Sequence, residues 1–384
     1  MFKIRRNLAL LFGINVIVAF QMGIVNPLFP LFIKDLGASV LEMGIVLFLG
    51  GLTATMFMLP SGVLADRYNR RKLFIISNLI GATAILLYTT IENWVQVIPW
   101  AILANVSSAL FLPSRMTLIA DSTESKSMAT AYGFMNIAWP VGFIFGPFIG
   151  GFIAGNYGWR FVFYTASLIS FASTLLMLFL EDPREKEKRR EKEASLEPFL
   201  NRQILLVLGI FVLIHFFGNT ARGILSSMIP IYLDTGFHRT TEEIGLFFSI
   251  AFGVATFTSQ IPGGILADKY GRKEVMLSSM LALPLISALW PFLGNYLLFL
   301  LVYTVISALW SATWPSAAAY LMSLLPTSRK GFSIAFRQTA VRLGFTVGPL
   351  LGSYLWEMFT PLVALCSTSL FFAAALILTS FLKS

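Results

Sequence analysis

Long apolar runs, separated by short polar turns, dominate the hydropathy pattern of the chain. A helix that crosses a membrane needs about 20 mainly apolar residues. Twelve segments meet that length, and they cover residues 8–33, 42–64, 73–91, 95–118, 128–154, 160–180, 203–233, 243–267, 275–293, 296–322, 331–357 and 362–382. The pattern therefore predicts an all-α membrane protein with twelve transmembrane helices. The first run begins with basic residues, as a signal peptide does, but continues to Ile33 without a small-residue cleavage site, which predicts a retained first span.

Charged residues divide the chain into two halves. The stretch EDPREKEKRREKEASLEP at residues 181–198 has mixed charge and few apolar residues, so it predicts a solvated linker at 181–199 between six-helix bundles at 1–180 and 200–384. Lys and Arg gather in alternate loops, and the predicted outer loops hold only Lys34, Arg160 and Arg239. The positive-inside rule then places both termini in the cytoplasm. The predicted location is the plasma membrane of the cell. The net charge of +9 reflects this topology rather than a nucleic-acid partner.

The two halves are sequence repeats. The segment GVLADRYNRRK at 62–72 returns as GILADKYGRKE at 264–274, an offset of 202 residues. The same offset relates Pro113 to Pro315, and GFIFGPFIGG at 142–151 to GFTVGPLLGS at 344–353. Two six-helix repeats related by an axis along the membrane normal are typical of one large class of secondary transporters.

These motifs resemble those of the major facilitator superfamily, over nearly the whole chain. GVLADRYNRRK resembles the signature of that family between spans 2 and 3, and GILADKYGRK resembles its echo between spans 8 and 9. Asn69 stands where the pattern has Gly, and a turn there is expected to need a positive φ, which Asn tolerates. GFIFGPFIGG resembles a signature of the twelve-span drug/proton antiporter branch. The resemblance implies a monomeric transporter that works by alternating access.

The resemblance also implies a gate at the two charged motifs, which would latch the halves together on the cytoplasmic side. Asp66 and Asp268 lie one turn from the membrane edge, where a carboxylate can meet a helix N-terminus or an arginine. The alternative is that these charges only set the topology. The predicted gating residues are Gly62, Asp66, Arg67, Arg70, Arg71, Asp121, Gly264, Asp268 and Arg272.

Glycines spaced three and four residues apart give a helix a smooth face that a second helix can approach closely. The predicted packing residues are Gly142, Gly146, Pro147, Gly150, Gly151, Gly344, Gly348 and Pro349. Whether this motif also sets the transport direction stays open. The antiporter branch carries an arginine before the proline of span 4, but the segment WAILANVSSALFLP at 100–113 has no basic residue, which argues against proton antiport.

The charged residues inside the spans are all basic. Acidic residues lie at span ends or in loops, whereas Arg115, Arg222, Arg337 and Arg342 lie within spans. An ionisable group inside the bilayer costs about 2.5–3.5 kcal/mol and is a functional candidate by default. Arginine keeps its proton, so these residues favour an anionic or zwitterionic substrate. In span 7, His215, Asn219, Arg222 and Ser226 follow helical spacing and form one polar stripe.

The predicted substrate-binding residues are Arg342, Arg222, His215, Asn219, Gln338, Gln21, Asn26, Trp310, Trp314 and Arg115. Several have a structural alternative: His215 as a helix–helix hydrogen-bonding residue, Arg115 as a snorkelling side chain, Arg222 and Arg342 as members of structural ion pairs, and the tryptophans as packing residues. The resemblance places spans 1, 4, 7 and 10 around a central cavity.

The predicted function is a secondary active transporter of the efflux type for a small molecule. The alternatives are a transporter or exchanger of organic anions or phosphorylated metabolites, a lipid flippase, and a receptor or scaffold on the same fold. A coupling proton and membrane lipids are further predicted partners. The sequence shows no catalytic, cofactor or metal-ligand pattern, so no enzyme is predicted.

Overall fold

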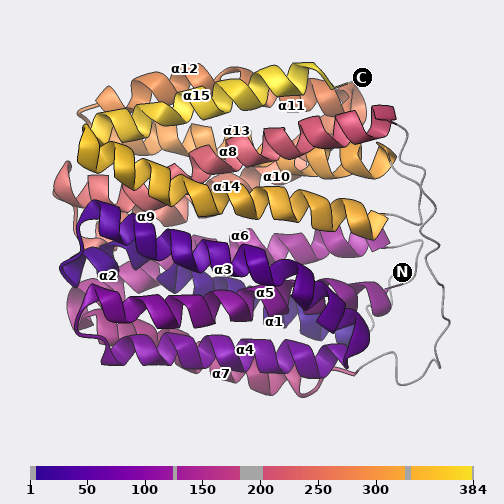
Figure 1. Cartoon of the computed structure of the whole chain (residues 1–384), viewed down its shortest axis with the longest axis horizontal. Helices are drawn as coiled ribbons and strands as arrows, with labels where there is room; N and C mark the ends of the chain where they lie inside the picture. The colour runs from indigo at the N-terminus through magenta and orange to yellow at the C-terminus, as the bar shows by residue number, and fades with distance from the viewer. Residues whose placement is uncertain (1–5, 124–127, 182–201, 325–329, 383–384) are drawn as a thin grey trace. The chain divides into compact units, whose positions relative to one another are not determined.

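The computed structural model describes residues 6–123, 128–181, 202–324 and 330–382, and all the regular structure in these ranges is helical (Figure 1). The first half contains α1 (Arg6–Val25), α2 (Phe29–Asp35), α3 (Val40–Arg67), α4 (Arg70–Leu87), α5 (Val97–Asp121), α6 (Met128–Tyr157) and α7 (Trp159–Met177). The second half contains α8 (Arg202–Thr235), α9 (Thr241–Phe248), the π-helix η5 (Ser249–Val254), α10 (Ala255–Tyr270), α11 (Arg272–Leu281), α12 (Leu283–Leu289), α13 (Tyr296–Leu324), α14 (Lys330–Met358) and α15 (Pro361–Ser380).

Eleven helical segments of the described residues are long and apolar enough to cross a membrane. They agree with the predicted spans to within a few residues at each end, and the all-α membrane fold is confirmed. The helix α14 is 29 residues long but is not among the eleven. It carries the polar Gln338 and Arg342, which lower its apolar content. Its role as the twelfth span stays a prediction.

The first predicted span is divided in two. Between α1 and α2 the chain turns at Asn26–Leu28, and Pro27 lies in that turn. Proline has no backbone N–H, and its ring clashes with the carbonyl four residues earlier, so a helix ends or bends at this point. The short helix α2 continues the span, and both parts together run from Arg6 to Asp35.

The turn at Asn69 differs from the sequence expectation. Asn69 has a φ of −63° and lies at the N-cap of α4, where its side chain accepts a hydrogen bond from the backbone N–H of Lys72. The expectation of a positive φ was therefore wrong. Asparagine is a strong N-cap residue because its side-chain oxygen satisfies a free N–H of the first helical turn. At the equivalent position of the second repeat, Gly271 has no side chain and adopts a φ of +103°.

The described helices form two compact units. Unit 1 comprises Met1–Ser39, Leu49–Glu191 and Leu233–Ser249, and unit 2 comprises Val40–Phe48, Lys192–Tyr232 and Ile250–Ser384. Most of each unit is one sequence repeat, but each also contains a short segment of the other. The division into bundles at 1–180 and 200–384 stays a prediction, and the linker at 181–199 lies outside the described residues except for Glu181.

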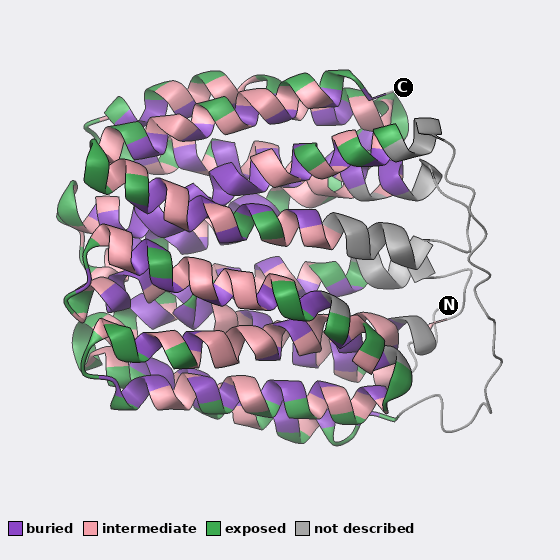
Figure 2. Cartoon of the chain, in the orientation of Figure 1, coloured by how far each residue is buried: buried purple, intermediate pink, exposed green. Residues whose placement is uncertain are grey.

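Apolar side chains fill the interior of unit 1 and also cover much of the surface of both units. The core contains Leu11, Ile14, Phe74 and Met177, which come from α1, α4 and α7. In Figure 2 buried and exposed residues alternate along the helices. Large apolar side chains are also exposed, for example Leu168 at 70%. Such a surface suits contact with lipid rather than with water.

Glycines bring the helix backbones into direct contact in each unit. In unit 1, a Cβ atom added at Gly146 of α6 would lie 2.7 Å from the carbonyl oxygen of Phe20 in α1. In unit 2, a Cβ atom added at Gly348 of α14 would lie 2.6 Å from the carbonyl oxygen of Thr220 in α8. Similar close approaches to α1 or α8 occur at Gly142, Gly150 and Gly344, and Pro349 lies beside Gly223. This geometry supports the packing interpretation of the repeated glycine motif.

We expect Gly146→Ala to lower the stability of the folded protein by about 1–3 kcal/mol, because its methyl group has only backbone atoms of α1 to displace. The unfolding midpoint of the protein purified in detergent measures this. The matched control is Gly209→Ala in α8, where an added Cβ meets no atom within 4 Å. Since alanine favours a helix over glycine by about 1 kcal/mol, the control should be neutral or stabilising. Equal midpoints for the two variants would contradict the packing interpretation.

Candidate functional site

The polar stripe predicted for α8 is largely buried in unit 2. His215, Asn219 and Arg222 are each less than 8% exposed, whereas Ser226 is exposed. The side-chain amide of Asn219 donates a hydrogen bond to the carbonyl oxygen of His215, 2.7 Å away. The ring of Phe211 contacts the His215 ring edge-on, with 4.6 Å between centroids. The stripe is thus three buried polar side chains with an aromatic neighbour at one end.

Arg222 lies in the most distinctive environment of the stripe. Its guanidinium carbon is 5.1 Å from the ring centroid of Phe252, a cation–π arrangement. Phe252 comes from η5, a single π-helical turn, and such turns often occur at functional sites. Within the described part of the chain, no carboxylate forms an ion pair with Arg222, and its guanidinium lies against the face of the Phe252 ring.

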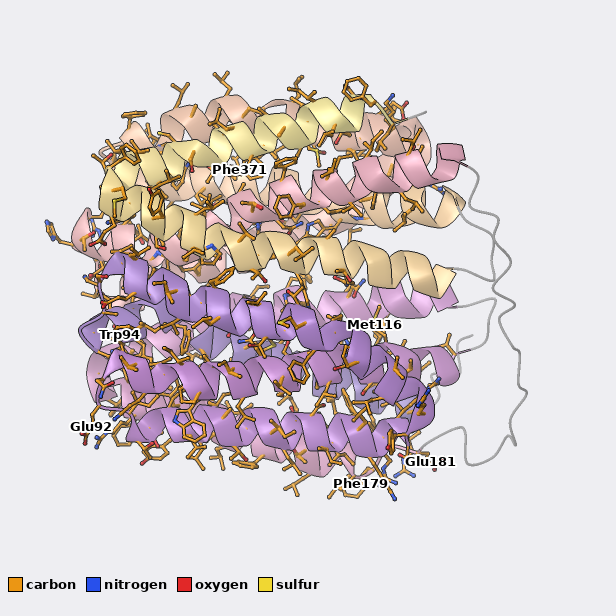
Figure 3. All side chains as sticks on the ribbon, viewed as in Figure 1. Glu92, Trp94, Met116, Phe179, Glu181 and Phe371 are labelled. Carbon is orange, nitrogen blue, oxygen red and sulfur yellow. The ribbon has the colours of Figure 1, made fainter. Side chains whose placement is uncertain are left out.

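Aromatic residues surround the rest of the α8 face. Trp310 of α13 is 1% exposed; its ring lies against Gly218 of α8 and contacts the ring of Phe372 at 5.6 Å. Phe371 of α15, labelled in Figure 3, contacts Phe217 at 6.4 Å. This burial favours the packing alternative for Trp310.

The other predicted binding residues are spread over both units. Trp314 on α13, and Gln338 and Arg342 on α14, are half-buried. In unit 1, Gln21 of α1 and Arg115 of α5 are buried, and Asn26 is exposed in the turn after α1. The structure therefore groups His215, Asn219, Arg222 and Trp310, and a single site that also includes residues of unit 1 stays a prediction.

Three of the predicted gating arginines donate hydrogen bonds to backbone carbonyls near helix C-termini. Arg70 donates to Ala65 at 3.3 Å, Arg71 donates to Leu178, and Arg272 donates to Ala319 at 2.9 Å. Ala65 and Leu178 lie at the C-terminal ends of α3 and α7, where the last carbonyls lack internal partners and a cation is favourable. These arginines thus have a structural role that the motif alone does not reveal.

The aspartates of the predicted latch are less defined. Asp268 and Arg67 are exposed, and the side chains of Asp66, Asp121 and Arg337 fall outside the described part of the structure. An added Cβ at Gly62 would meet no atom within 4 Å, and one at Gly264 would make only an ordinary contact with Pro315. The cytoplasmic latch stays a prediction.

Unit 1 also has a set of contacts at the helix ends away from the chain termini, and these contacts were not predicted from the sequence. There, Lys34 of α2 forms an ion pair with Asp234 of α8, and both side chains are about a third exposed, at 33% and 39%. These residues are 200 positions apart in the chain and belong to different repeats. The one sequence signal was the rarity of lysine in the predicted outer loops.

The helices α6 and α9 meet in the same region. A Cβ added at Gly245 of α9 would overlap the carbonyl oxygen of Pro147, and one added at Gly151 would overlap that of Thr241. The backbone N–H of Phe148 donates to the Ser249 hydroxyl at 3.0 Å. Pro147 and Gly151 thus contact a helix of the other repeat, whereas Gly142, Gly146 and Gly150 contact α1.

The comparison with known families decides the class of this protein. The sequence model of the Major Facilitator Superfamily matches residues 11–234 and 211–384. The chain belongs to this superfamily. Its members are transporters and not enzymes, and the motifs at 62–72 and 142–151 are consistent with the assignment.

Several relatives are bacterial drug-resistance proteins. Multidrug resistance protein 2 of Bacillus subtilis is 27% identical over 352 residues, which cover 90% of this chain and 87% of the relative. The multi-drug resistance efflux pump PmrA of Streptococcus pneumoniae is 25% identical, and 90% of this chain and 88% of the relative are covered. The quinolone resistance protein NorA of Staphylococcus aureus is 22% identical, with 88% and 86% covered.

Solved structures support the fold. A bacterial homologue of the human lysosomal transporter Spinster, in an inward-facing and occupied conformation, superposes with a TM-score of 0.82 at 13% identity, covering 99% of this chain and 97% of that chain. A mutant form of the nucleoside transporter NupG gives a TM-score of 0.78 at 16% identity, with 97% and 98% covered. At these identities the likeness concerns the fold alone.

The setting of Arg222 predicts how the protein responds to losing that charge. We expect Arg222→Met to leave the free energy of unfolding unchanged or to raise it by about 1–3 kcal/mol, because a buried cation without a carboxylate partner among the described residues is costly and methionine fills similar volume. Thermal unfolding in detergent measures this. A matched control is Asn78→Leu, since the Asn78 amide donates to Ser170, Ser173 and Thr174 and its loss should destabilise unit 1. A strongly lowered midpoint for Arg222→Met would instead assign Arg222 a structural role.

Proposed function

We propose that this protein is a secondary transporter of the efflux type, which moves a small molecule across the plasma membrane by alternating access. The observation that carries the proposal is the similarity, over about nine-tenths of the chain, to proteins named as multidrug and quinolone resistance factors. The duplicated six-helix architecture supports it, because alternating access in such folds is a movement of one repeat against the other. Both termini are cytoplasmic in this proposal.

The outer contacts of unit 1 are suited to a gate in such a cycle. The Lys34–Asp234 ion pair, and the packing of α6 on α9, join segments of different repeats at the end of the spans away from the termini. An exposed ion pair contributes little to stability, typically about 0–1 kcal/mol, so it can form and break during a cycle. We propose that this pair closes the outer side.

The substrate class has a second candidate. Arg222 supports transport of an organic anion or phosphorylated metabolite, since a buried guanidinium over an aromatic ring, with no carboxylate partner among the described residues, is a ready partner for a carboxylate or phosphate. A lipid flippase with the same cationic residues is a further alternative. For proton coupling, His215 is the titratable side chain of the buried stripe.

We expect reversal of one charge of the outer pair to open the outer side, because Lys34→Asp and Asp234→Lys each place like charges together. Spin labels at Ser39→Cys and Thr235→Cys, in a Cys366→Ser background, measure the separation of these segments. The population of the longer distances should rise about two- to fivefold, which is the range expected for the loss of a partly exposed ion pair. The double swap should restore the wild-type distribution. The control is Arg239→Gln, which removes a pair with Glu243 that is local to the start of α9. If none of the variants changes the distance distribution, the proposed outer gate is contradicted.

We expect Arg342→Ala to abolish substrate binding without unfolding the protein, since Arg342 lies half-buried in mid-helix on α14. A panel of organic anions, phosphate esters and lipophilic cations identifies the ligand by its thermal stabilisation of the wild type, which grows with the logarithm of ligand concentration over Kd. The control is Arg160→Ala, at an exposed position. Unchanged stabilisation in a folded Arg342→Ala variant would contradict the role. Stabilisation by anions alone would favour the anion transporter, and stabilisation by lipophilic cations would favour drug efflux.

A further inference from the structure

Arg222 lies on the side of α8 that packs against α13 in unit 2. Three contacts show that the two helices run antiparallel along this side, and they join Phe211 to Tyr320, Gly218 to Trp310, and Tyr232 to Phe299. Arg222 follows Gly218 by four residues, so it lies opposite the turn of α13 that precedes Trp310. Ser307 belongs to that turn.

The helix α10 packs on a neighbouring side of α13 and runs parallel to it. The hydroxyls of Ser259 and Ser311 are hydrogen-bonded, and a Cβ added at Gly263 would lie 2.7 Å from a backbone carbonyl oxygen of α13. Thr256, Ser259 and Gly263 follow helical spacing and share the face toward α13. Thr256 is three residues before Ser259, and Ser307 is four residues before Ser311, so Thr256 and Ser307 lie at the same level.

The hydroxyls of Thr256 and Ser307 are buried donors. Both residues are 0% exposed, and neither hydroxyl has a hydrogen-bond partner among the described residues. Nearby hydroxyls on the same two helices, those of Thr258 and Thr304, donate to the carbonyl oxygen four residues earlier. A buried polar group without a partner costs free energy, so these two donors are available to a ligand.

Arg222 adds a positive charge to this junction of α8, α10 and α13. It is 7% exposed, its guanidinium lies over the Phe252 ring, and no carboxylate among the described residues forms an ion pair with it. Phe252 is four residues before Thr256, so the ring and the hydroxyl are about one turn apart. The junction therefore combines one cation, two hydroxyl donors and an aromatic face.

This combination matches a carboxylate better than a phosphate. A carboxylate carries one negative charge and about four lone-pair sites on two oxygens. The guanidinium offers a fork of two N–H donors, and the two hydroxyls supply the other two hydrogen bonds. A phosphate monoester carries a charge of about −1.5 to −2 at pH 7. A single arginine leaves part of that charge unbalanced, which is costly in a buried site.

The first repeat has no cation at the equivalent positions. An offset of 202 residues relates Arg222, Thr256 and Ser307 to Phe20, Ala54 and Asn105. The Asn105 amide donates to a carbonyl oxygen of its own helix, 2.9 Å away. The cation and the two free hydroxyls are therefore not required by the fold that both repeats share.

We propose that this junction binds the carboxylate group of a monocarboxylate substrate. Arg222 holds the carboxylate with its two-donor fork, Thr256 and Ser307 donate the remaining hydrogen bonds, and the apolar part of the molecule lies against the Phe252 ring. The proposal rests on the proposed transport function and names the substrate class at Arg222. Thr256 and Ser307 are its specificity-determining residues.

The test is binding to the purified full-length protein in detergent, in a chloride-free buffer, measured by thermal unfolding and by equilibrium titration. The probes are benzoate, phenyl phosphate, benzyltrimethylammonium and chloride, and we expect benzoate to bind best. Thr256→Val and Ser307→Ala should each weaken benzoate binding about ten- to hundredfold, the loss expected for one hydrogen bond to a charged group. Each should keep or raise the unfolding midpoint without ligand, because it removes a buried hydroxyl that lacks a partner among the described residues.

The matched control is Ser316→Ala. Ser316 is also 0% exposed on α13, and its hydroxyl also lacks a partner among the described residues, but it lies about 14 Å along the helix from Ser307. Its loss should change the midpoint in the same way and leave benzoate binding unchanged. Equal benzoate losses in Ser316→Ala and Ser307→Ala would overturn the proposal.

The choice of probes separates this site from its alternatives. Equal binding of phenyl phosphate and benzoate would overturn the preference for a carboxylate, and equal stabilisation by chloride would assign the junction to an inorganic ion. Stabilisation by benzyltrimethylammonium alone would overturn the carboxylate site and leave the efflux proposal standing. Benzoate binding that depends on Thr256 and Ser307, in a reconstituted protein that moves none of the probes, would support the site and count against the proposed transport function.

Discussion

The direct contact of helix backbones at glycines is the interaction on which the rest of this structure depends. Between helices in a bilayer there is no hydrophobic driving force, because lipid tails are as apolar as leucine, so packing at short range has to hold the helices together. Gly146 sets α6 against α1, and Gly348 sets α14 against α8. Because α8 is held in this way, the face of the helix that carries His215 and Arg222 has a fixed direction within unit 2. The position of the polar stripe follows from a packing motif that has no polar atom in its side chains.

The features predicted correctly from the sequence are those encoded locally. The length of an apolar run is a property of one segment, and so the spans were found to within a few residues. The break after α1 and the N-cap role of Asn69 depend on the choice between two local hydrogen-bonding patterns, which one sequence does not resolve. The Lys34–Asp234 pair joins positions 200 residues apart, and no periodicity connects them. The stacking of Arg222 on Phe252 depends on a π-helical turn that has no signature in the apolar pattern.

The repeat preserves the helix-packing residues and the charged loop motif, but not the cations inside the spans. Gly146 and Gly348, or Pro113 and Pro315, are the same residue at equivalent positions. The cations inside the spans are not: Arg222 corresponds to Phe20, and Arg342 to Pro140. The residues that differ between the repeats are therefore the place to look for specificity.

The sign of the charge at Arg222 constrains which molecules such a transporter can hold near α8. Two like charges about 6 Å apart repel each other by about 3 kcal/mol at an effective dielectric constant near 20, which corresponds to more than a hundredfold in affinity. Repulsion of this size excludes a lipophilic cation from the vicinity of Arg222. An anion or the anionic end of a zwitterion gains a comparable amount, and the ring of Phe252 beside the guanidinium offers an apolar surface to the rest of the molecule. For the proposed transporter, a zwitterionic amphiphile would match this setting, with its anionic end at Arg222 and its apolar part at the Phe252 ring.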